Sequence, residues 1–325
     1  MNLKKVLVTG GAGFIGSTLV RELLARGYKI TVLDNMSIGL IENLPDGDGA
    51  LKIIAGDVRD FEMVSAVVHG HNLVLHLAAQ AFIPMSYDLP VKCADVNSIG
   101  SLNVFKACLD HDVKRIVHVS SSEVYGSSRY VPMDEKHPLN PVSTYAVSKL
   151  AADLWAQSMY FEHKLPVVIL RPFNTFGPRD TLPRFIPEII RQNLKEPVIK
   201  VGNLQSGRDY TFVTDTAKGI IKAMECEDIE GEIINFGTGR SPKMHEILSM
   251  ILKRMDTENK EVVQDKTRLR PHDVNNLISD ASKARKLLGW APEFNLEDGL
   301  QKTIDWYMNN GQTWMYEKRG WYWKF

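Results

Sequence analysis

Short apolar runs alternate with stretches of helical periodicity through the first half of the chain. Residues 6–9 form an apolar run that ends in glycines, and apolar residues recur at helical spacing over 14–26. This pattern predicts a buried parallel strand followed by a helix. Further strands are predicted at 29–33, 53–54, 73–77, 115–119 and 167–170, and further helices at 91–109 and 144–163. Because strands alternate with helices, we predict an α/β fold with a doubly wound parallel sheet and helices on both faces.

The regular alternation stops near residue 175. Prolines at 178, 183, 187 and 197 interrupt the second half, and its apolar segments become shorter. A strand is predicted at 231–236, and helices are predicted at 245–255 and 280–288. We interpret residues 1–175 as one domain and residues 176–325 as a smaller lobe that is partly interleaved with it. A cleft between two closely packed lobes is the expected place for a ligand.

The composition is that of an ordinary globular protein, with 325 residues of which 44% are apolar and 24% charged. The 39 basic and 39 acidic side chains cancel, so no overall basic charge favours nucleic acid or an anionic membrane as a partner. Cys93, Cys108 and Cys226 are widely spaced and follow no metal-binding pattern, so we expect free thiols and no metal site. No signal peptide or membrane span is recognisable in the sequence, which favours a cytoplasmic protein.

Glycines follow the first predicted strand at positions 10, 13 and 16. The spacing suits a dinucleotide, because Gly10 permits a tight turn, Gly13 lets the backbone approach a pyrophosphate, and Gly16 lets the helix pack closely on the strand. The N-terminus of that helix offers free N–H groups to the phosphates. Asp34 ends the next strand, where it can accept hydrogen bonds from the adenosine ribose, and no cation follows it at 35–37. The sequence therefore predicts a Rossmann-type domain that binds NAD rather than NADP.

Tyr145 and Lys149 lie four residues apart within the helix predicted at 144–163. Residues at this spacing share one helix face, so the ammonium is expected to lower the pKa of the phenol and make Tyr145 a general base. Three serines and Glu123 follow the strand predicted at 115–119, at the edge where doubly wound sheets bind ligands. A serine there can bond the reacting oxygen, and Glu123 can remove a proton next to a ketone.

Together these motifs resemble the extended short-chain dehydrogenase/reductase family, which contains NAD-dependent nucleotide-sugar epimerases, dehydratases and decarboxylases. The resemblance covers almost the whole chain. It includes TGGAGFIG (9–16), LDNMS (33–37), GDVRD (56–60), HLAAQ (76–80), SSSEVYG (120–126), YAVSK (145–149), RPFNTFGPR (171–179), GRDYTFVTD (207–215), RLRPHDV (268–274) and SDASKARKLLGW (279–290). It implies an NAD-dependent enzyme that acts on a nucleotide-diphosphate sugar, and we expect a UDP-sugar.

The resemblance also implies roles for single residues, by their positions in the motifs. The catalytic residues would be Ser121, Glu123, Tyr145 and Lys149. Cofactor contacts are expected from Gly10, Gly13, Phe14, Ile15, Gly16, Asp34, Asn35, Ser37, Asp57, Val58, Leu77, Ala78, Ala79, Tyr145 and Lys149. Contacts with the sugar nucleotide are expected from Ser122, Asn174, Arg184, Arg208 and Arg270. Two arginines in the second lobe suit a diphosphate, because guanidinium groups bind phosphate oxygens in a bidentate manner.

The segment Ser121-Ser122-Glu123 bears on which reaction the chain catalyses. It resembles 4,6-dehydratases and UDP-glucuronate decarboxylases, whereas sugar 4-epimerases usually lack an acid at the position of Glu123. Once C4 of the sugar is oxidised, a dehydratase needs a base for the C5 proton, and a 4-epimerase does not. We therefore favour a nucleotide-sugar 4,6-dehydratase that acts on a UDP-N-acetylhexosamine or a similar substrate.

Three alternatives stay open from the sequence. Many dTDP-glucose dehydratases have Asp where Ser122 stands, which leaves room for a UDP-hexose or UDP-hexuronate 4-epimerase. A UDP-glucuronate decarboxylase would use Arg184 as the cation for the substrate carboxylate. A non-catalytic NAD-binding regulator could share the fold. The helices around 91–110 and 144–163 resemble the dimer interface of the family, so we expect a homodimer, whereas the aromatic tail that begins at Trp314 has no assigned role.

Overall fold

A central sheet of seven parallel strands organises the part of the chain that a computed structural model describes, residues 5–269, 274 and 276–310. The strands are β1 (Lys5–Thr9), β2 (Lys29–Asp34), β3 (Leu51–Ala55), β4 (Leu73–His76), β5 (Arg115–Val119), β6 (Val167–Pro172) and β10 (Ile233–Phe236). Their order is β10-β6-β5-β4-β1-β2-β3, and every neighbouring pair is parallel. The chain therefore winds outward from β1 in both directions, with the switch point between β1 and β4. The predicted Rossmann-type sheet is confirmed.

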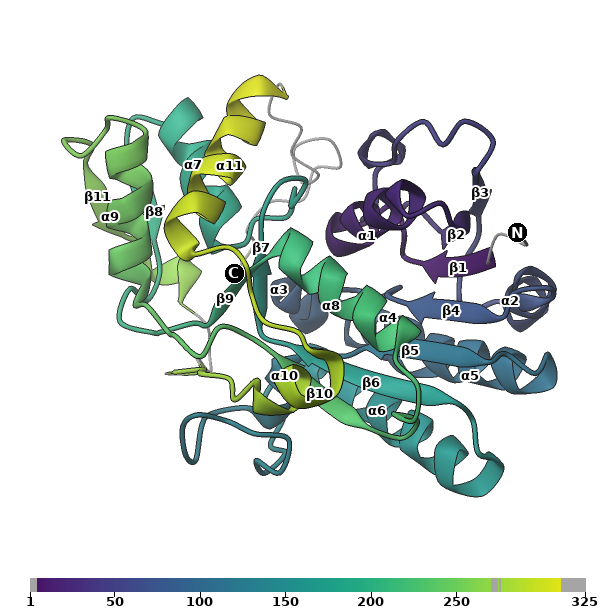
Figure 1. The fold of residues 1–325 in the computed structure, drawn as a ribbon. Helices are drawn as coiled ribbons and strands as arrows, with labels where there is room; N and C mark the ends of the chain where they lie inside the picture. Colours follow the sequence, from purple (N-terminus) through teal and green to yellow (C-terminus); the bar gives the residue numbers. More distant parts are fainter. Residues whose placement is uncertain (1–4, 270–273, 275, 311–325) are drawn as a thin grey trace.

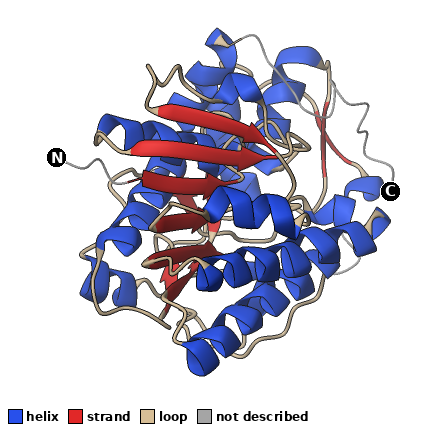
Figure 2. Ribbon diagram, turned by 90° about the vertical axis from the view of Figure 1, so that its right-hand side faces the viewer, coloured by secondary structure: helices blue, strands red, loops and turns tan. Residues whose placement is uncertain are grey.

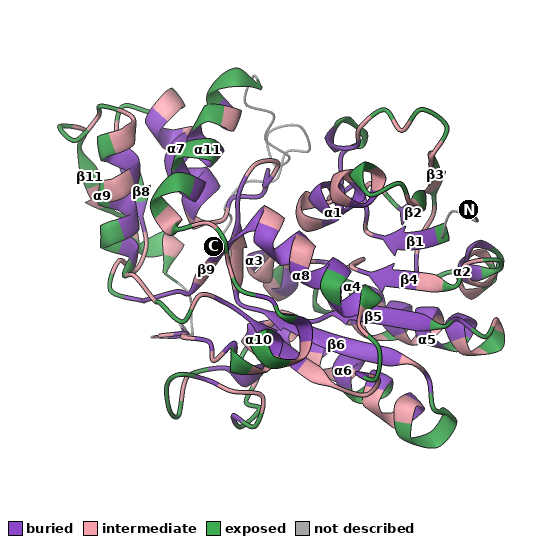
Figure 3. Cartoon of the chain, viewed as in Figure 1, coloured by how far each residue is buried: buried purple, intermediate pink, exposed green. Residues whose placement is uncertain are grey.

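Helices cover both faces of this sheet (Figure 1 and Figure 2). One layer contains α1 (Phe14–Ala25) and α8 (Val213–Glu225), which pack against each other and against one face of the sheet. The other layer contains α2 (Phe61–Val68), α5 (Gly100–Asp110) and α6 (Thr144–His163). Figure 3 shows β4, β5 and β6 buried along most of their length. Burial on both faces explains why these strands are continuous apolar runs rather than alternating ones.

The helix predicted at 91–109 is not continuous. A π-helical segment, Asp95–Ile99, separates α4 (Pro90–Ala94) from α5. At Gly100, the first residue of α5, a Cβ atom would lie 2.6 Å from a methyl carbon of Val58, so the helix approaches the neighbouring turn closely here. A π-bulge adds a residue to one turn without ending the helix, and the apolar periodicity does not reveal it. A short helix, α3 (Ile83–Asp88), precedes this region.

A second cluster of buried apolar side chains lies beyond the carboxyl ends of the strands (Figure 1). It contains α7 (Phe185–Lys195), α9 (Met244–Arg254), α11 (Leu296–Asn309) and two short parallel pairs, β7 (Asn174–Phe176) with β9 (Tyr210–Phe212) and β8 (Ile199–Val201) with β11 (Val262–Gln264). In contrast, α8, β10 and α10 (Ser282–Leu288) pack with the central sheet although they follow residue 175. The two parts are thus interleaved in sequence, and a domain boundary at residue 175 stays a prediction.

Three further expectations concern membrane spans, the cysteines and the aromatic tail. Across the described ranges, no helix has both the length and the apolar character needed to cross a membrane. Cys93, Cys108 and Cys226 are free thiols, and the first two are buried. The aromatic tail from Trp314 onward lies outside the described residues.

Candidate functional site

A cavity of about 380 Å³ lies between the central sheet and the second apolar cluster, within the usual range for small-molecule sites. The glycine turn after β1, the ends of β2, β4 and β5, the start of α6 and the segments around α7 and β8 form its wall. The predicted residues on this wall are Gly10, Gly13, Phe14, Ile15, Gly16, Asp34, Asn35, Ser37, Val58, Leu77, Ala78, Ala79, Ser121, Glu123, Tyr145, Lys149, Asn174, Arg184 and Arg208. The structure therefore brings these residues together, and their individual roles stay predictions.

The glycine turn has the shape that a bound pyrophosphate requires. Gly10 has a φ of 72°, and a Cβ atom there would lie 2.6 Å from the backbone nitrogen of Ala78. At Gly16, a Cβ atom would overlap the carbonyl oxygen of Gly10. Helix α1 begins at Phe14 with Gly13 as its N-cap, and no side chain caps it. The first N–H groups of α1 therefore lack an intrahelical partner at the cavity wall, as in helix termini that bind phosphate.

Asp34, at the end of β2, is 7% exposed and is held by two backbone donors. Its Oδ2 accepts a hydrogen bond of 3.0 Å from the N–H of Ala12, and its Oδ1 accepts one of 2.8 Å from the N–H of Met36. Burial raises the pKa of the Asp34 carboxyl group, and the two N–H donors offset part of that rise. The carboxylate is thus fixed at the wall, where it can accept hydrogen bonds from a ribose. These features fit NAD.

Two of the predicted ligand contacts, Asp57 and Ser122, are not among the residues that line the cavity. Asp57 forms an ion pair of 2.7 Å with Arg59 and accepts a hydrogen bond of 2.9 Å from Asn35, and Val58 lines the cavity beside it. Ser122 is 3% exposed and does not line the cavity. The cavity wall thus includes neither Asp57 nor Ser122, and their contacts with the cofactor and the substrate stay predictions. The hydrogen bond from Asn35 connects Asp57 with a residue of the wall.

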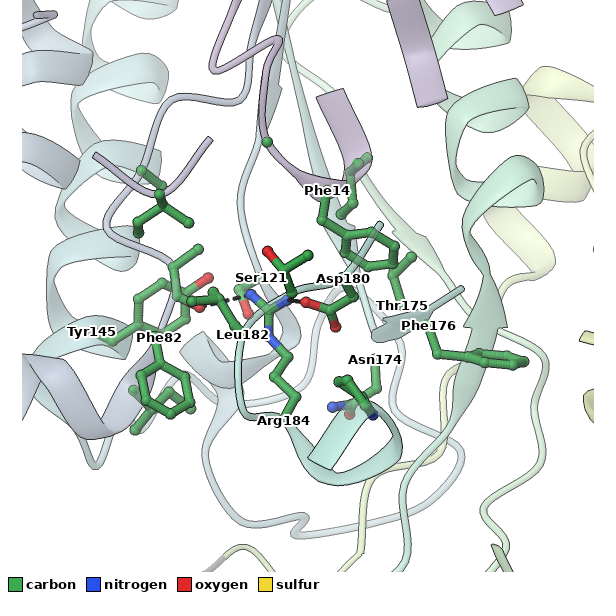
Figure 4. Close-up of a pocket in the computed structure, with 18 of the residues that line it drawn as sticks. Phe14, Phe82, Ser121, Tyr145, Asn174, Thr175, Phe176, Asp180, Leu182 and Arg184 are labelled. Carbon is green, nitrogen blue, oxygen red and sulfur yellow. Dashed lines mark hydrogen bonds and ion pairs between the residues drawn. The ribbon is translucent and has the colours of Figure 1, made fainter. Parts of the chain in front are cut away.

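The environment of Tyr145 differs from the one expected. Burial raises the pKa of Tyr145 to about 12, while a hydrogen bond with Ser121 and the charge of Arg184 lower it and the charge of Glu123 raises it. In the protein without ligands the pKa of Tyr145 is thus raised rather than lowered, and its role as general base stays a prediction. Figure 4 shows Tyr145, Ser121 and Arg184 around the same part of the cavity.

Lys149 is directed toward the sheet. It is 2% exposed, and its ammonium donates a hydrogen bond of 2.6 Å to the carbonyl oxygen of Val119 at the end of β5. Burial lowers the pKa of Lys149 to about 8, against the opposing charge of Asp153. Because an ammonium has three N–H donors, this geometry leaves donors for a hydroxyl group at the cavity wall.

A single helical turn, Ser122–Tyr125, places Glu123 on the cavity wall. Ser121 is the N-cap of this turn, and its Oγ accepts a hydrogen bond of 3.2 Å from the N–H of Glu123. Val124 and Tyr125 point into the core instead. A hydroxyl group, a carboxylate and the Tyr145 phenol therefore line one cavity, a set that can move protons to and from a bound sugar.

The guanidinium group of Arg184 is already paired. It donates a hydrogen bond of 2.6 Å to Oδ1 of Asp180 and one of 2.9 Å to the carbonyl oxygen of Ala81 (Figure 4). Asp180 is buried and lines the cavity, where burial raises its pKa and Arg184 lowers it. The sequence interpretation missed Asp180, although an acid four residues before an arginine is a known ion-pair spacing.

Arginines of the second lobe lie at the far end of the cavity. Arg208 is buried, lines the cavity and donates to two backbone carbonyl groups. Arg270 lies outside the described residues. Arg268 lines the cavity and pairs with the buried Glu188 at 3.1 Å. The prediction missed Arg268, and the signal that could have found it is its place as the first arginine of the same RLRP motif. Asn174 lines the wall with its Oδ1 buried and without a hydrogen-bond partner.

The chain is similar to known enzymes over most of its length. Residues 7–303 match the family model for GDP-mannose 4,6 dehydratase. The chain is 32% identical over 320 residues to dTDP-glucose 4,6-dehydratase of Streptomyces niveus, covering 95% of this chain and 94% of that relative.

Two solved structures show the same fold over nearly the whole chain. The dTDP-glucose 4,6-dehydratase DesIV of Streptomyces venezuelae, solved with NAD bound, has a TM-score of 0.91 at 30% identity and covers 96% of this chain and 99% of its own. The UDP-N-acetylglucosamine 4-epimerase of Methanobrevibacter ruminantium M1 has a TM-score of 0.86 at 32% identity and covers 95% of this chain and 99% of its own. The relatives therefore include both dehydratases and epimerases.

Proposed function

The chain belongs to the GDP-mannose 4,6-dehydratase family of NAD-dependent nucleotide-sugar dehydratases and epimerases, and from that premise we propose that it is a nucleotide-sugar 4,6-dehydratase. Its proposed substrate is a UDP-N-acetylhexosamine or a similar nucleotide sugar. The observation that carries the proposal is Glu123, which lines the cavity together with Ser121 and Tyr145. A dehydratase needs a carboxylate for the C5 proton, whereas inversion at C4 does not.

In the proposed reaction, each side chain handles one proton or one oxygen. When bound, NAD supplies the hydride acceptor for the sugar C4 and the hydride donor for C6. Tyr145 takes the proton of the C4 hydroxyl group, which Ser121 holds in place. Glu123 removes the C5 proton and passes it to the C6 hydroxyl group as the bond from C6 to oxygen breaks, so that water leaves. A solvent proton then returns to C5.

The residues that we propose to bind the cofactor and the sugar nucleotide line the same cavity. We propose that Gly10, Gly13 and the first turn of α1 hold the cofactor pyrophosphate, and that Asp34 holds the adenosine ribose. Arg208 and Arg268 are the proposed cations for the sugar-nucleotide diphosphate, and each lines the second-lobe end of the cavity.

The decarboxylase alternative is weakened by the pairing of Arg184. A decarboxylase needs a cation for the substrate carboxylate. The Arg184 guanidinium is already neutralised by Asp180 at 2.6 Å. An additional negative charge beside this pair would meet repulsion from Asp180.

We also propose a homodimer that associates through α6. Val147, Leu154 and Phe161 recur every seven residues on this helix and are 53%, 52% and 68% exposed. Val91 on the adjacent α4 is 72% exposed. An exposed apolar stripe of this kind is typical of a helix that packs against a partner. A cytoplasmic location is proposed because the three cysteines are free thiols.

The reaction can be identified with a panel of UDP-, dTDP- and GDP-sugars in deuterated water, followed by mass spectrometry and NMR. A 4-keto-6-deoxy product with deuterium at C5 would support the dehydratase. Inversion at C4 without exchange at C5 would indicate a 4-epimerase, and release of carbon dioxide from UDP-glucuronate would indicate a decarboxylase. Bound NAD without turnover of any sugar would favour a regulator.

The role of Glu123 can be tested separately. Glu123→Gln is expected to abolish dehydration while reduction of bound NAD by the sugar C4 stays detectable at 340 nm, because only the C5 base is lost. Glu258→Gln, on the exposed surface, is the matched control and is expected to keep full turnover. Full turnover of Glu123→Gln would show that Glu123 is not the base.

A further inference from the structure

A cluster of buried charged side chains lies behind Tyr145 and Lys149. Asp153 is 0% exposed and follows Lys149 by four residues on α6, so the two lie on the same face of the helix. Asp153 does not line the cavity. Because a carboxylate is costly to bury unless it is paired, its place in the interior calls for a physical reason. The reaction proposed above does not use it.

The carboxylate of Asp153 is held in one position from the neighbouring strands. Its Oδ2 lies 2.9 Å from Nε of Arg171, which is 1% exposed on β6. The guanidinium carbon of Arg171 lies 5.0 Å from the ring centroid of Tyr125, and the hydroxyl group of Tyr125 donates a hydrogen bond of 2.7 Å to Asn235 on β10. These contacts fix both the position and the charge of Asp153.

Histidines on the other side of Asp153 add no charge. Nε2 of His118 lies 3.4 Å from Oδ1 of Asp153, and burial lowers the pKa of His118 to about 4 despite that carboxylate. Its ring stacks on that of His76 with centroids 5.4 Å apart, and burial places the pKa of His76 well below its usual value. At neutral pH the buried charges are therefore one carboxylate between the cations Lys149 and Arg171.

This balance matters because Lys149 is close to losing its proton. Its pKa is lowered to about 8 by burial, and the negative charge of Asp153 is the first of the influences that raise it. The titratable groups that interact with Lys149 are Asp153 on α6, Cys93 on α4, His76 on β4 and His118 on β5. Tyr145 and Glu123 line the same cavity, and Arg171 on β6 pairs with Asp153. Asp153 is the fully buried carboxylate among them.

We propose that Asp153 is a positioning residue that keeps the Lys149 ammonium charged, so that Lys149 can bind the cofactor at the cavity wall beside Tyr145. The charge acts through Lys149, and Asp153 itself contacts neither cofactor nor sugar. The inference rests on the proposed function only in assigning Tyr145 and Lys149 to an NAD-dependent reaction. It holds equally for a dehydratase and for an epimerase.

The test measures NAD affinity between pH 6 and pH 9.5 by quenching of tryptophan fluorescence in the cofactor-free full-length protein. Wild-type affinity is expected to fall as the pH rises through about 8, because Lys149 loses its charge there. In Asp153→Asn the fall is expected at least one pH unit lower, with affinity at pH 6 nearly unchanged. Asp153→Glu keeps the charge and is expected to keep the wild-type midpoint.

A merely structural role would give a different result. It would weaken NAD binding equally at every pH and leave the midpoint of the fall unchanged, and this outcome would overturn the proposal. If Asp153→Asn leaves Arg171 unpaired and does not fold, Asp153→Asn with Arg171→Gln removes both buried charges and carries the same test. A smaller downward shift is expected, because losing the Arg171 cation offsets part of the loss of the Asp153 carboxylate. Because the readout is NAD affinity, failure of the dehydratase proposal would leave it unaffected.

Discussion

Replacing Gly10 by alanine would separate the cost of an unfavourable backbone conformation from the cost of a steric clash. At a φ of 72°, any L-residue loses about 1–2 kcal/mol relative to glycine. A Cβ atom at Gly10 would also lie 2.6 Å from the backbone nitrogen and 2.8 Å from the Cα of Ala78. These are backbone atoms of the turn that follows β4, and they cannot rotate away as a side chain could. Overpacking of this kind costs a further ~1–3 kcal/mol.

Gly27 supplies a matched control. Its φ is 77°, almost that of Gly10, but a Cβ atom there would meet nothing within 4 Å. Gly27→Ala should therefore lower the free energy of unfolding by about 1–2 kcal/mol, and Gly10→Ala should lower it by about 2–5 kcal/mol. Urea denaturation measures both values, provided that the m-value stays constant.

The two variants should also differ in cofactor binding. The strain at Gly10 displaces the turn that faces the pyrophosphate, so the dissociation constant for NAD is expected to rise at least tenfold, or by about 1.4 kcal/mol. Gly27 lies outside the cavity wall, and its variant is expected to bind NAD normally. Equal losses of stability and unchanged NAD binding in both variants would refute the reasoning that the turn after β1 requires glycine at position 10.

The remaining predictions concern Asp34 and the surface of α6. Asp34→Asn should raise the dissociation constant for NAD about tenfold, because its two oxygens each accept a backbone N–H and the amide group would turn a donor toward one of these; unchanged affinity by calorimetry would contradict this. Leu154→Glu should produce a monomer in analytical ultracentrifugation, whereas Met308→Glu on α11, 56% exposed, should not change the mass. A dimeric Leu154→Glu variant would argue against an interface at α6.

The central sheet was predictable because its signals are local. β1, β5 and β6 are continuous apolar runs, and each is followed by polar or glycine-containing turns. The strand predicted at 231–236 is also observed, as β10, but its place beside β6 at the edge of the main sheet depends on pairing with a strand more than 60 residues earlier. Neither that pairing nor the π-helical segment Asp95–Ile99 changes the local periodicity, so the sequence contains no direct signal for them.

The candidate site was predictable where a motif fixes the backbone. The spacing of Gly10 and the place of Asp34 at the end of a strand are local features, and both residues line the cavity as expected. Asp57 and Val58 show the limit of this reasoning. They are adjacent in one motif, yet the turn directs Val58 to the wall and Asp57 toward Arg59. Which of two neighbouring residues faces a ligand depends on side-chain packing that spacing does not describe.

Tyr145 shows why the strength of a base follows from burial as much as from spacing. The four-residue interval correctly places Lys149 on the same helix, but burial raises the pKa of Tyr145 to about 12, and the Arg184 guanidinium is the charge that lowers it. Arg184, the N-cap of α7, is in turn neutralised by its ion pair with Asp180, which lies four residues earlier in the chain. Any ligand that loosens this ion pair would expose Tyr145 to more positive charge and favour its phenolate. The basicity of Tyr145 is therefore coupled to the ion pair between Arg184 and Asp180.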